Sequence, residues 1–234
     1  MDENIRINRF LSMCGVCSRR EADVIIDAER VTINGKIATL GDRVSSLDKV
    51  CLDNKEIYIE EEFILLAYNK PLGVECTADA KNPDNIIKKI GFNKKIFYVG
   101  RLDKNSTGLI LMTNDGMLCN KIAKSVNGHE KEYIVETDKE ITNEFLMKMK
   151  SGVNILDVKT KPCKVRKLGA KKFGIILTQG LNRQIRRMCD ALGYKVVSLK
   201  RIRVMNIELK DLAEGTYRMC TKEEIEEIRK QAGI

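Results

Sequence analysis

The sequence predicts an α+β fold in two parts: a small helical unit with a hairpin sheet, then a larger domain on a mixed, largely antiparallel sheet. Two helical patterns and a short hairpin signal fill the first part. The predicted secondary structure changes after residues 60–62, which are three glutamates. Beyond them, short apolar strands outnumber helices and many follow one another directly. The 234 residues are 43% hydrophobic, enough to bury a sizeable core. We expect domains at residues 1–60 and 63–234.

The first part begins with two helices. Apolar residues recur at helical spacing at Ile7, Phe10, Leu11 and Cys14. Ser18, with Glu21 three residues later, forms a capping box that predicts the start of the second helix. Asn34 and Gly35 lie between β-branched residues, a pattern that favours a tight hairpin.

The second part reads as a series of short strands. We expect them at residues 63–73, 95–100, 108–112, 130–137, 172–180 and 195–209. Three helices are expected among them. Asn114 or Asp115 begins the first, Asn182 begins the second, and Thr221 with Glu224 begins the third. In the last strand Arg201 and Arg203 alternate with apolar residues, so strict alternation predicts one basic face and one buried face.

The charge of the chain favours a polyanionic partner. It carries 42 Lys and Arg against 33 Asp and Glu, a net charge of +9, and nucleic acid is the leading candidate. Basic residues gather around the two N-terminal helices and the hairpin, at Arg6, Arg9, Arg19, Arg20, Arg30 and Lys36. This cluster is either a seat for phosphates or a solvated polar face.

The sequence indicates a cytoplasmic protein without a metal site. It shows no secretory signal and no apolar run of membrane-spanning length. The eight cysteines have no disulfide-like rhythm, so we expect reduced thiols. Cys14 and Cys17 form a C-x-x-C pair, but a structural zinc ion needs a second pair or nearby histidines, and His129 is the only histidine.

Several motifs in order resemble a known family. The stretch from residue 5 to residue 44 resembles the S4 RNA-binding domain. The strings NKPLG, GRLDKNSTGLILMTNDG, KEY and GLNRQIRRMCDALGY are similar to the successive motifs of the RsuA/RluB/E/F branch of RNA pseudouridine synthases. GLNRQIRRMC and LKRIRVMN resemble most closely the F type, which modifies 23S rRNA, the large-subunit ribosomal RNA. The resemblance implies an S4 domain followed by a catalytic domain on a long mixed sheet crossed by a cleft.

The resemblance also implies the chemistry. The family detaches uracil from ribose at N1, turns the base and rejoins it through C5, which needs no cofactor. Asp103, in the R-L-D motif, matches the essential carboxylate, which attacks the sugar or deprotonates a glycal-like species. Arg186 matches the basic residue that pairs with this aspartate, and an arginine suits the place because it stays charged. Tyr133, in KEY, matches the tyrosine that stacks on the flipped uracil.

The remaining candidate residues are expected to contact RNA or shape the cleft. In the catalytic domain they are Lys70, Arg101, Asn182, Arg183, Gln184, Arg201 and Arg203, and we expect Lys70 to be structural first. In the S4 unit they are Arg6, Arg9, Arg19, Arg20 and Lys36. The expected partner is a stem-loop of large-subunit rRNA, bound by a monomer. Two alternatives stay open: an inactive S4-type assembly factor that binds rRNA, or the same chemistry on small-subunit rRNA or tRNA.

Overall fold

The chain folds into two compact units, each with its own core. The computed structural model describes residues 4–59, 62–123 and 128–234. The units are Met1–Phe63 and Ile64–Ile234. Of the acidic join that the sequence suggests, residues 60 and 61 lie outside the described residues.

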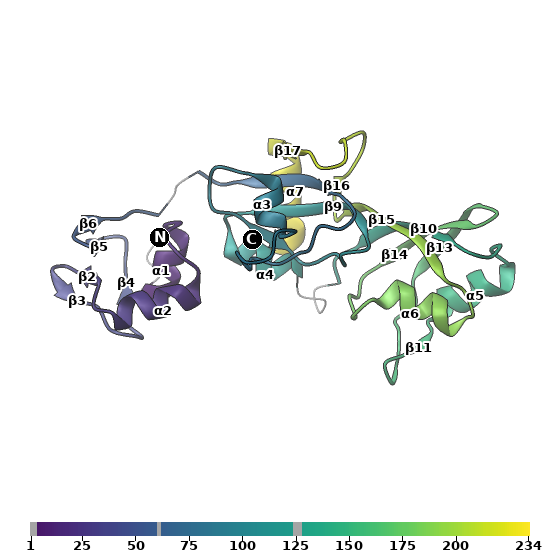
Figure 1. Cartoon of the computed structure of the whole chain (residues 1–234), viewed down its shortest axis with the longest axis horizontal. Coiled ribbons are helices and arrows are strands. Elements are labelled where there is room, and N and C mark those ends of the chain that lie inside the picture. The colour runs from purple at the N-terminus through teal and green to yellow at the C-terminus, as the bar shows by residue number, and fades with distance from the viewer. Residues whose placement is uncertain (1–3, 60–61, 124–127) are drawn as a thin grey trace. The chain divides into compact units, whose positions relative to one another are not determined.

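The first unit packs two helices against short strands (Figure 1). The helices are α1 (Ile7–Met13) and α2 (Arg19–Asp27), and the predicted Ser18–Glu21 capping box begins α2. The strands are β1 (Ile5–Arg6), β2 (Val31–Ile33), β3 (Lys36–Ile37), β4 (Arg43–Val44), β5 (Val50–Leu52) and β6 (Lys55–Glu56). Asn34 and Gly35 both have positive φ in the turn between β2 and β3, as the hairpin signal requires. The core includes Phe10, Leu11 and Ile26.

The second unit is built on one long sheet of order β13-β14-β10-β15-β9-β7-β17, with β16 on β15 and β8 on β9. Its strands are β7 (Leu65–Lys70), β8 (Phe97–Val99), β9 (Thr107–Thr113), β10 (Lys131–Thr137), β13 (Lys164–Gly169), β14 (Lys172–Leu177), β15 (Val196–Val204), β16 (Ile207–Glu208) and β17 (Tyr217–Met219). A separate small hairpin joins β11 (Asn154–Ile155) and β12 (Val158–Lys159). Most pairings in the long sheet are antiparallel, and the parallel pair β9–β15 joins its two halves.

The joint between β9 and β15 brings two backbones unusually close. Gly108 on β9 lies opposite Arg201 on β15 and has φ +101°. A Cβ atom at Gly108 would lie 2.2 Å from the carbonyl oxygen of Arg201, so a larger residue does not fit there.

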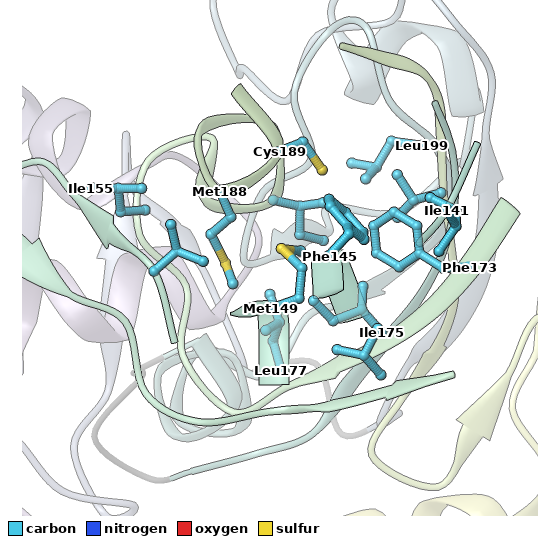
Figure 2. Packing of buried hydrophobic residues seen from close by; sticks show 14 residues of the cluster. Ile141, Phe145, Met149, Ile155, Phe173, Ile175, Leu177, Met188, Cys189 and Leu199 are labelled. Atoms are coloured by element: carbon cyan, nitrogen blue, oxygen red, sulfur yellow. The ribbon is translucent and has the colours of Figure 1, made fainter. Parts of the chain in front are cut away.

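Helices cover the two halves of the sheet separately. They are α3 (Ile86–Ile90), α4 (Gly116–Ala123), α5 (Asn143–Ser151), α6 (Gln184–Ala191) and α7 (Lys222–Ala232). Phe145 and Met149 of α5 and Met188 of α6 pack on β10, β13, β14 and β15 (Figure 2). A second core lies under α3, beside β7 and β9. Tyr133 packs against both cores, so the boundary between them falls at this residue.

The helix ends confirm two of the predicted caps and correct a third. The Asp115 carboxylate accepts hydrogen bonds from the backbone N–H groups of Met117 and Leu118 at the start of α4. Thr221 and Glu224 form a capping box at α7. Asn182 does not cap α6, however: Arg183 occupies the N-cap position in a left-handed conformation, and the Asn182 side-chain oxygen accepts from Arg187 instead. No helix among the described residues has the length and apolar character to cross a bilayer.

Candidate active site

A pocket of about 580 Å³ lies in the second unit where its two half-sheets meet. It is lined by the segment between β8 and β9, by β10 and β15, and by the start of α6. Its size falls within the range of roughly 300–1,000 Å³ typical of sites for small ligands. Asp103, Tyr133, Arg183 and Arg186 all line it, so residues far apart in the sequence meet there.

Asp103 lies in the turn between a short strand and a buried one. β8 ends at Val99, Gly100 has φ +68°, and the Ser106 N–H donates to the Asp103 carbonyl at 3.0 Å. The neighbouring Leu102 is buried and anchors the turn. The Asp103 side chain keeps 33% of its surface exposed, so it faces the pocket rather than the core.

The cation next to Asp103 differs from the expected one. Arg183 Nη1 lies 3.7 Å from Asp103 Oδ2. The Arg186 guanidinium instead donates hydrogen bonds to two backbone carbonyls, from Nη2 to Asn105 at 2.5 Å and from Nη1 to Val196 at 3.3 Å. The predicted Asp103–Arg186 ion pair is therefore wrong for this structure. The reason lies at the start of α6. Arg183 is the N-cap residue, and its left-handed backbone directs its side chain toward Asp103, while Arg186 bonds to the turn that contains Asp103.

Arg186 still belongs to the electrostatics of the site. Burial lowers the pKa of Arg186 and the nearby Arg183 lowers it further, while the charge of Asp103 raises it. Its buried Nε has no hydrogen-bond partner among the described residues. Asp103 is thus flanked by two guanidinium groups, one in direct contact and one acting at longer range.

A bulge in β15 places Arg201 and Arg203 on opposite faces of the sheet. Tyr133 pairs with Arg201 and Glu132 with Arg203, which leaves Ile202 as an extra residue on β15. Cross-strand partners share a face and successive residues alternate, so Arg201 lies on the Tyr133 face and Arg203 on the Glu132 face. The prediction of one basic face on this strand is wrong. The extra residue of the bulge shifts the inward and outward alternation of side chains by one position, so the two arginines no longer share a face.

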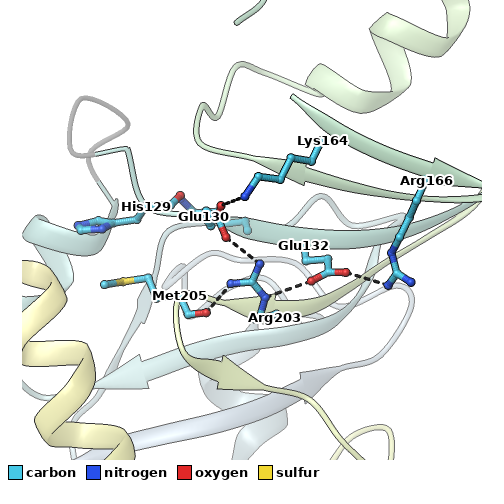
Figure 3. A network of polar contacts seen from close by, with 8 residues as sticks. His129, Glu130, Glu132, Lys164, Arg166, Arg203 and Met205 are labelled. Carbon is cyan, nitrogen blue, oxygen red and sulfur yellow. Dashed lines mark hydrogen bonds and ion pairs between the residues drawn. The ribbon is translucent and has the colours of Figure 1, made fainter. Parts of the chain in front are cut away.

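Arg203 belongs to an ion network on the face away from the pocket (Figure 3). Its Nη2 lies 2.9 Å from Glu130 and its Nε lies 3.1 Å from Glu132. Lys164 and Arg166 add further ion pairs to the same two glutamates. Its guanidinium is committed within the protein, which contradicts the prediction that Arg203 grips RNA.

Three further residues predicted to contact RNA are buried: Lys70, Gln184 and Arg201. The Lys70 ammonium donates to the carbonyls of Pro71 and Val74, and the Gln184 side-chain oxygen accepts from the Leu181 N–H. Arg201 Nε donates to the Leu109 carbonyl at 2.6 Å. Lys70 and Gln184 use these groups within the protein, which corrects their assignment as RNA contacts. Arg201 is buried at the pocket wall, but its Nη2 has no hydrogen-bond partner among the described residues.

The other predicted RNA contacts lie on the surface. Arg101, Asn182 and Arg183 are exposed around the pocket. In the first unit Arg6, Arg19, Arg20 and Lys36 are exposed and Arg9 is partly buried. These side chains are accessible to a partner.

Lys131 is a pocket residue that the sequence interpretation missed. It is two residues before Tyr133 on β10, so both side chains point to the pocket face, and both line the pocket. Burial, with a smaller effect of Arg201, lowers the pKa of Lys131 to about 8. The signal was present in the string KEY, because a lysine two positions from a cleft tyrosine must share its face.

The arrangement suits chemistry on a base. An ionisable carboxylate faces a cationic pocket with an aromatic ring on one side, as nucleophilic or proton-transfer catalysis requires. Within residues 4–59, 62–123 and 128–234, no group of His, Cys, Asp and Glu side chains is placed to hold a metal ion. The eight cysteines are free thiols, and burial raises the pKa of Cys14, in the C-x-x-C pair, to about 12.

Comparisons with known proteins agree with this geometry. A family model described as RNA pseudouridylate synthase matches residues 64–191, and the S4 domain model matches residues 5–50. The dual-specificity RNA pseudouridine synthase RluF of Escherichia coli (strain K12) is 46% identical over 231 residues, which cover 98% of this chain and 80% of that protein. The ribosomal large subunit pseudouridine synthase B of Bacillus subtilis (strain 168) is 31% identical, covering 96% and 95%.

A solved structure extends the similarity to the whole fold. The crystal structure of a pseudouridylate synthase superposes with a TM-score of 0.69 at 29% identity, covering 96% of this chain and 99% of that chain.

Proposed function

The chain belongs to the RNA pseudouridine synthase family, and we propose that it isomerises one or a few uridines of 23S, the large-subunit, ribosomal RNA. The enzyme is an isomerase of this family, with an S4 domain ahead of the catalytic domain. One observation carries the proposal. Asp103 lies just before the buried strand β9 and lines the pocket together with Tyr133, Arg183 and Arg186. The large-subunit target is supported by the relative from B. subtilis, whose name states it.

The proposed reaction needs a carboxylate that stays near the sugar while the base turns. Asp103 either attacks C1′ of the ribose, or takes the proton from C2′ as the base leaves, which gives a glycal-like species. Tyr133, half-buried between the two cores, is proposed to stack on the everted uracil. Arg183 and Arg186 are proposed to hold the Asp103 carboxylate in place by their positive charge.

Everting a uridine costs a few kcal/mol, and the cost is least in a loop or bulge. This favours a stem-loop as the substrate. The exposed Arg101 and Arg183 at the pocket are proposed to hold phosphates beside the flipped nucleotide, and Arg6, Arg9, Arg19, Arg20 and Lys36 of the S4 unit to hold a more distant part of the RNA. The protein is proposed to act as a monomer, and a ribosomal target favours the cytoplasm.

Asp103→Asn tests the proposal because it removes the charge and keeps the shape. With rRNA labelled by tritium at C5 of uridine, the wild-type protein should release tritium, and Asp103→Asn should release it at least about a thousandfold more slowly. The affinity of the variant for RNA should stay near that of the wild-type protein.

The same assay addresses the alternatives. If the wild-type protein binds rRNA yet releases no tritium from any RNA, the chain is an inactive S4-type assembly factor. A pseudouridine map of RNA from a deletion strain identifies the target, and a missing modification in small-subunit rRNA or tRNA would overturn the 23S assignment.

A further inference from the structure

Arg201 is a buried cation of the pocket and Lys131 a half-buried one, and neither forms an ion pair with a described residue. By contrast, Arg183 is matched by Asp103 and Lys104 by Asp84, and Arg186 donates to two backbone carbonyls. The contact of Lys131 Nζ with the His129 carbonyl is long, at 3.4 Å, and Arg201 Nη2 has no partner in the described chain. Burying like charges together is unfavourable unless a ligand compensates them.

The position of Lys131 relative to Tyr133 indicates what this ligand is. Residues two apart on a strand are separated by about 7 Å and point the same way. The Lys131 ammonium now contacts the His129 carbonyl, and its flexible four-carbon chain lets it turn toward the edge of a ring that stacks on Tyr133. At the edge of a uracil lie its carbonyl oxygens.

We propose that Lys131 is a catalytic residue whose ammonium donates a hydrogen bond to a uracil carbonyl and stabilises the negative charge that develops when the base leaves the ribose. When the N1–C1′ bond breaks, its electron pair stays on the uracil and spreads onto the carbonyl oxygens. When the C5–C1′ bond forms, that electron pair makes the new bond. In the same step C1′ gives up its bond to the Asp103 carboxylate or, in the glycal-like species, C2′ takes back its proton. The proton lost from C5 is balanced by the proton gained at N1, and nothing is oxidised or reduced. This inference rests on the proposed function.

The depth of the two cations favours the base over a phosphate. Arg201 is only 2% exposed, and Lys131 is half-buried and close enough to Arg201 for that charge to lower its pKa. The phosphates stay on the polynucleotide chain at the surface, where Arg101 and Arg183 are exposed. A flipped base is the part of the substrate that reaches the floor, and a cation in a site closed to water stabilises charge more strongly than one in solvent.

The charged and titratable surroundings of Lys131 determine its protonation. His129 precedes Lys131 in the chain, just before β10. The charged and titratable residues that line the pocket with Lys131 are Glu75, Cys76, Arg101, Asp103, Lys104, Tyr133, Arg183, Arg186 and Arg201. Burial and Arg201 lower the pKa of Lys131 to about 8, so the protonated form is lost as the pH rises through that value. Because the proposed role needs the protonated form, kcat should fall above about pH 8. In Lys131→Arg the cation persists, so this fall should move to higher pH.

Lys131→Met and Lys131→Arg test the proposal, with Lys172→Met, an exposed lysine of β14, as the matched control. The substrate is total RNA from a strain lacking the enzyme, labelled at C5 of uridine, so the result does not depend on which RNA is the target. We expect the single-turnover rate of Lys131→Met to fall by about 10²–10³-fold, the loss typical of removing one charge-stabilising donor. The RNA affinity of Lys131→Met and the rate of Lys172→Met should stay within about twofold of wild type.

Thermal unfolding separates catalysis from a structural role. An uncompensated buried charge destabilises the fold, so the melting temperature of Lys131→Met should equal or exceed that of the wild-type protein at pH 7. A variant that keeps the wild-type rate would overturn the proposal, as would one that melts earlier and loses RNA affinity in proportion to rate. If the wild type modifies an RNA other than 23S while Lys131→Met stays slow, the target assignment fails and the role of Lys131 stands.

Discussion

At the residue scale, the site divides its two arginines between different tasks. Arg183 is exposed at the start of α6 and contacts Asp103 directly, so water and salt screen their attraction. Arg186 is more buried and donates to the Asn105 carbonyl, two residues beyond the aspartate. The first arginine acts on the charge of Asp103, and the second fixes the turn that aims its carboxylate.

This division predicts different consequences for the two substitutions. Arg186→Gln should lower the single-turnover rate by about a hundredfold, because a small misplacement of a catalytic group costs that much. Arg183→Gln should cost less, and its effect should shrink as salt rises. Single-turnover tritium release at low and high salt measures both. Equal losses for the two variants, with the same salt dependence, would contradict the division.

At the element scale, the site depends on the parallel joint between β9 and β15. The joint brings the turn that carries Asp103 beside the strand that carries Arg201, and Arg201 donates to the Leu109 carbonyl across it. Gly108 permits the close approach of the two backbones. The glycine that follows Thr107 in the motif is therefore explained by packing rather than by chemistry.

Gly108→Ala should destabilise the second unit by about 2–5 kcal/mol, because the added Cβ meets the Arg201 carbonyl and positive φ is strained for alanine. Denaturant unfolding of the variant measures the loss. Gly180→Ala is a suitable control, since a Cβ at Gly180 meets nothing within 4 Å and its φ is not in the left-handed range. Equal stability of the two variants would mean that β9 and β15 can move apart at Gly108 at little cost in free energy.

The sequence predicted local features better than those set by distant partners. The caps at Ser18, Asp115 and Thr221 follow from side chains that bond within three residues, so the pattern alone is sufficient. The bulge at Ile202 depends on how β10 pairs with β15, and the paired residues there are more than sixty positions apart in the sequence. The pattern of polar and apolar residues within β15 alone therefore does not indicate the bulge. The burial of Lys70 also depends on distant strands, because β7 lies between β9 and β17 in the folded sheet.

At the scale of the whole molecule, the proposed function gives the first unit a role in RNA binding and the second unit the chemistry. Each has its own core, and the pocket is lined by residues of the second unit alone. In the first unit Arg19 and Arg20 occupy the first turn of α2 and are exposed, although a helix N-terminus favours negative charge. A phosphate bound there would be favoured by both arginines and by the helix dipole.

Removing these two charges should therefore weaken RNA binding and leave the chemistry of bound RNA unchanged. If each arginine neutralises one phosphate, the slope of log K against log salt should fall in magnitude by about 1.5 in Arg19→Ala/Arg20→Ala. Lys171→Ala/Lys172→Ala removes two exposed charges from the second unit and serves as the matched control. Filter binding across a salt titration gives the slope, and single-turnover release at saturating protein gives the rate. A variant with the wild-type slope would place the phosphate contacts elsewhere, and a slower rate at saturation would show that the S4 unit also positions the RNA for reaction.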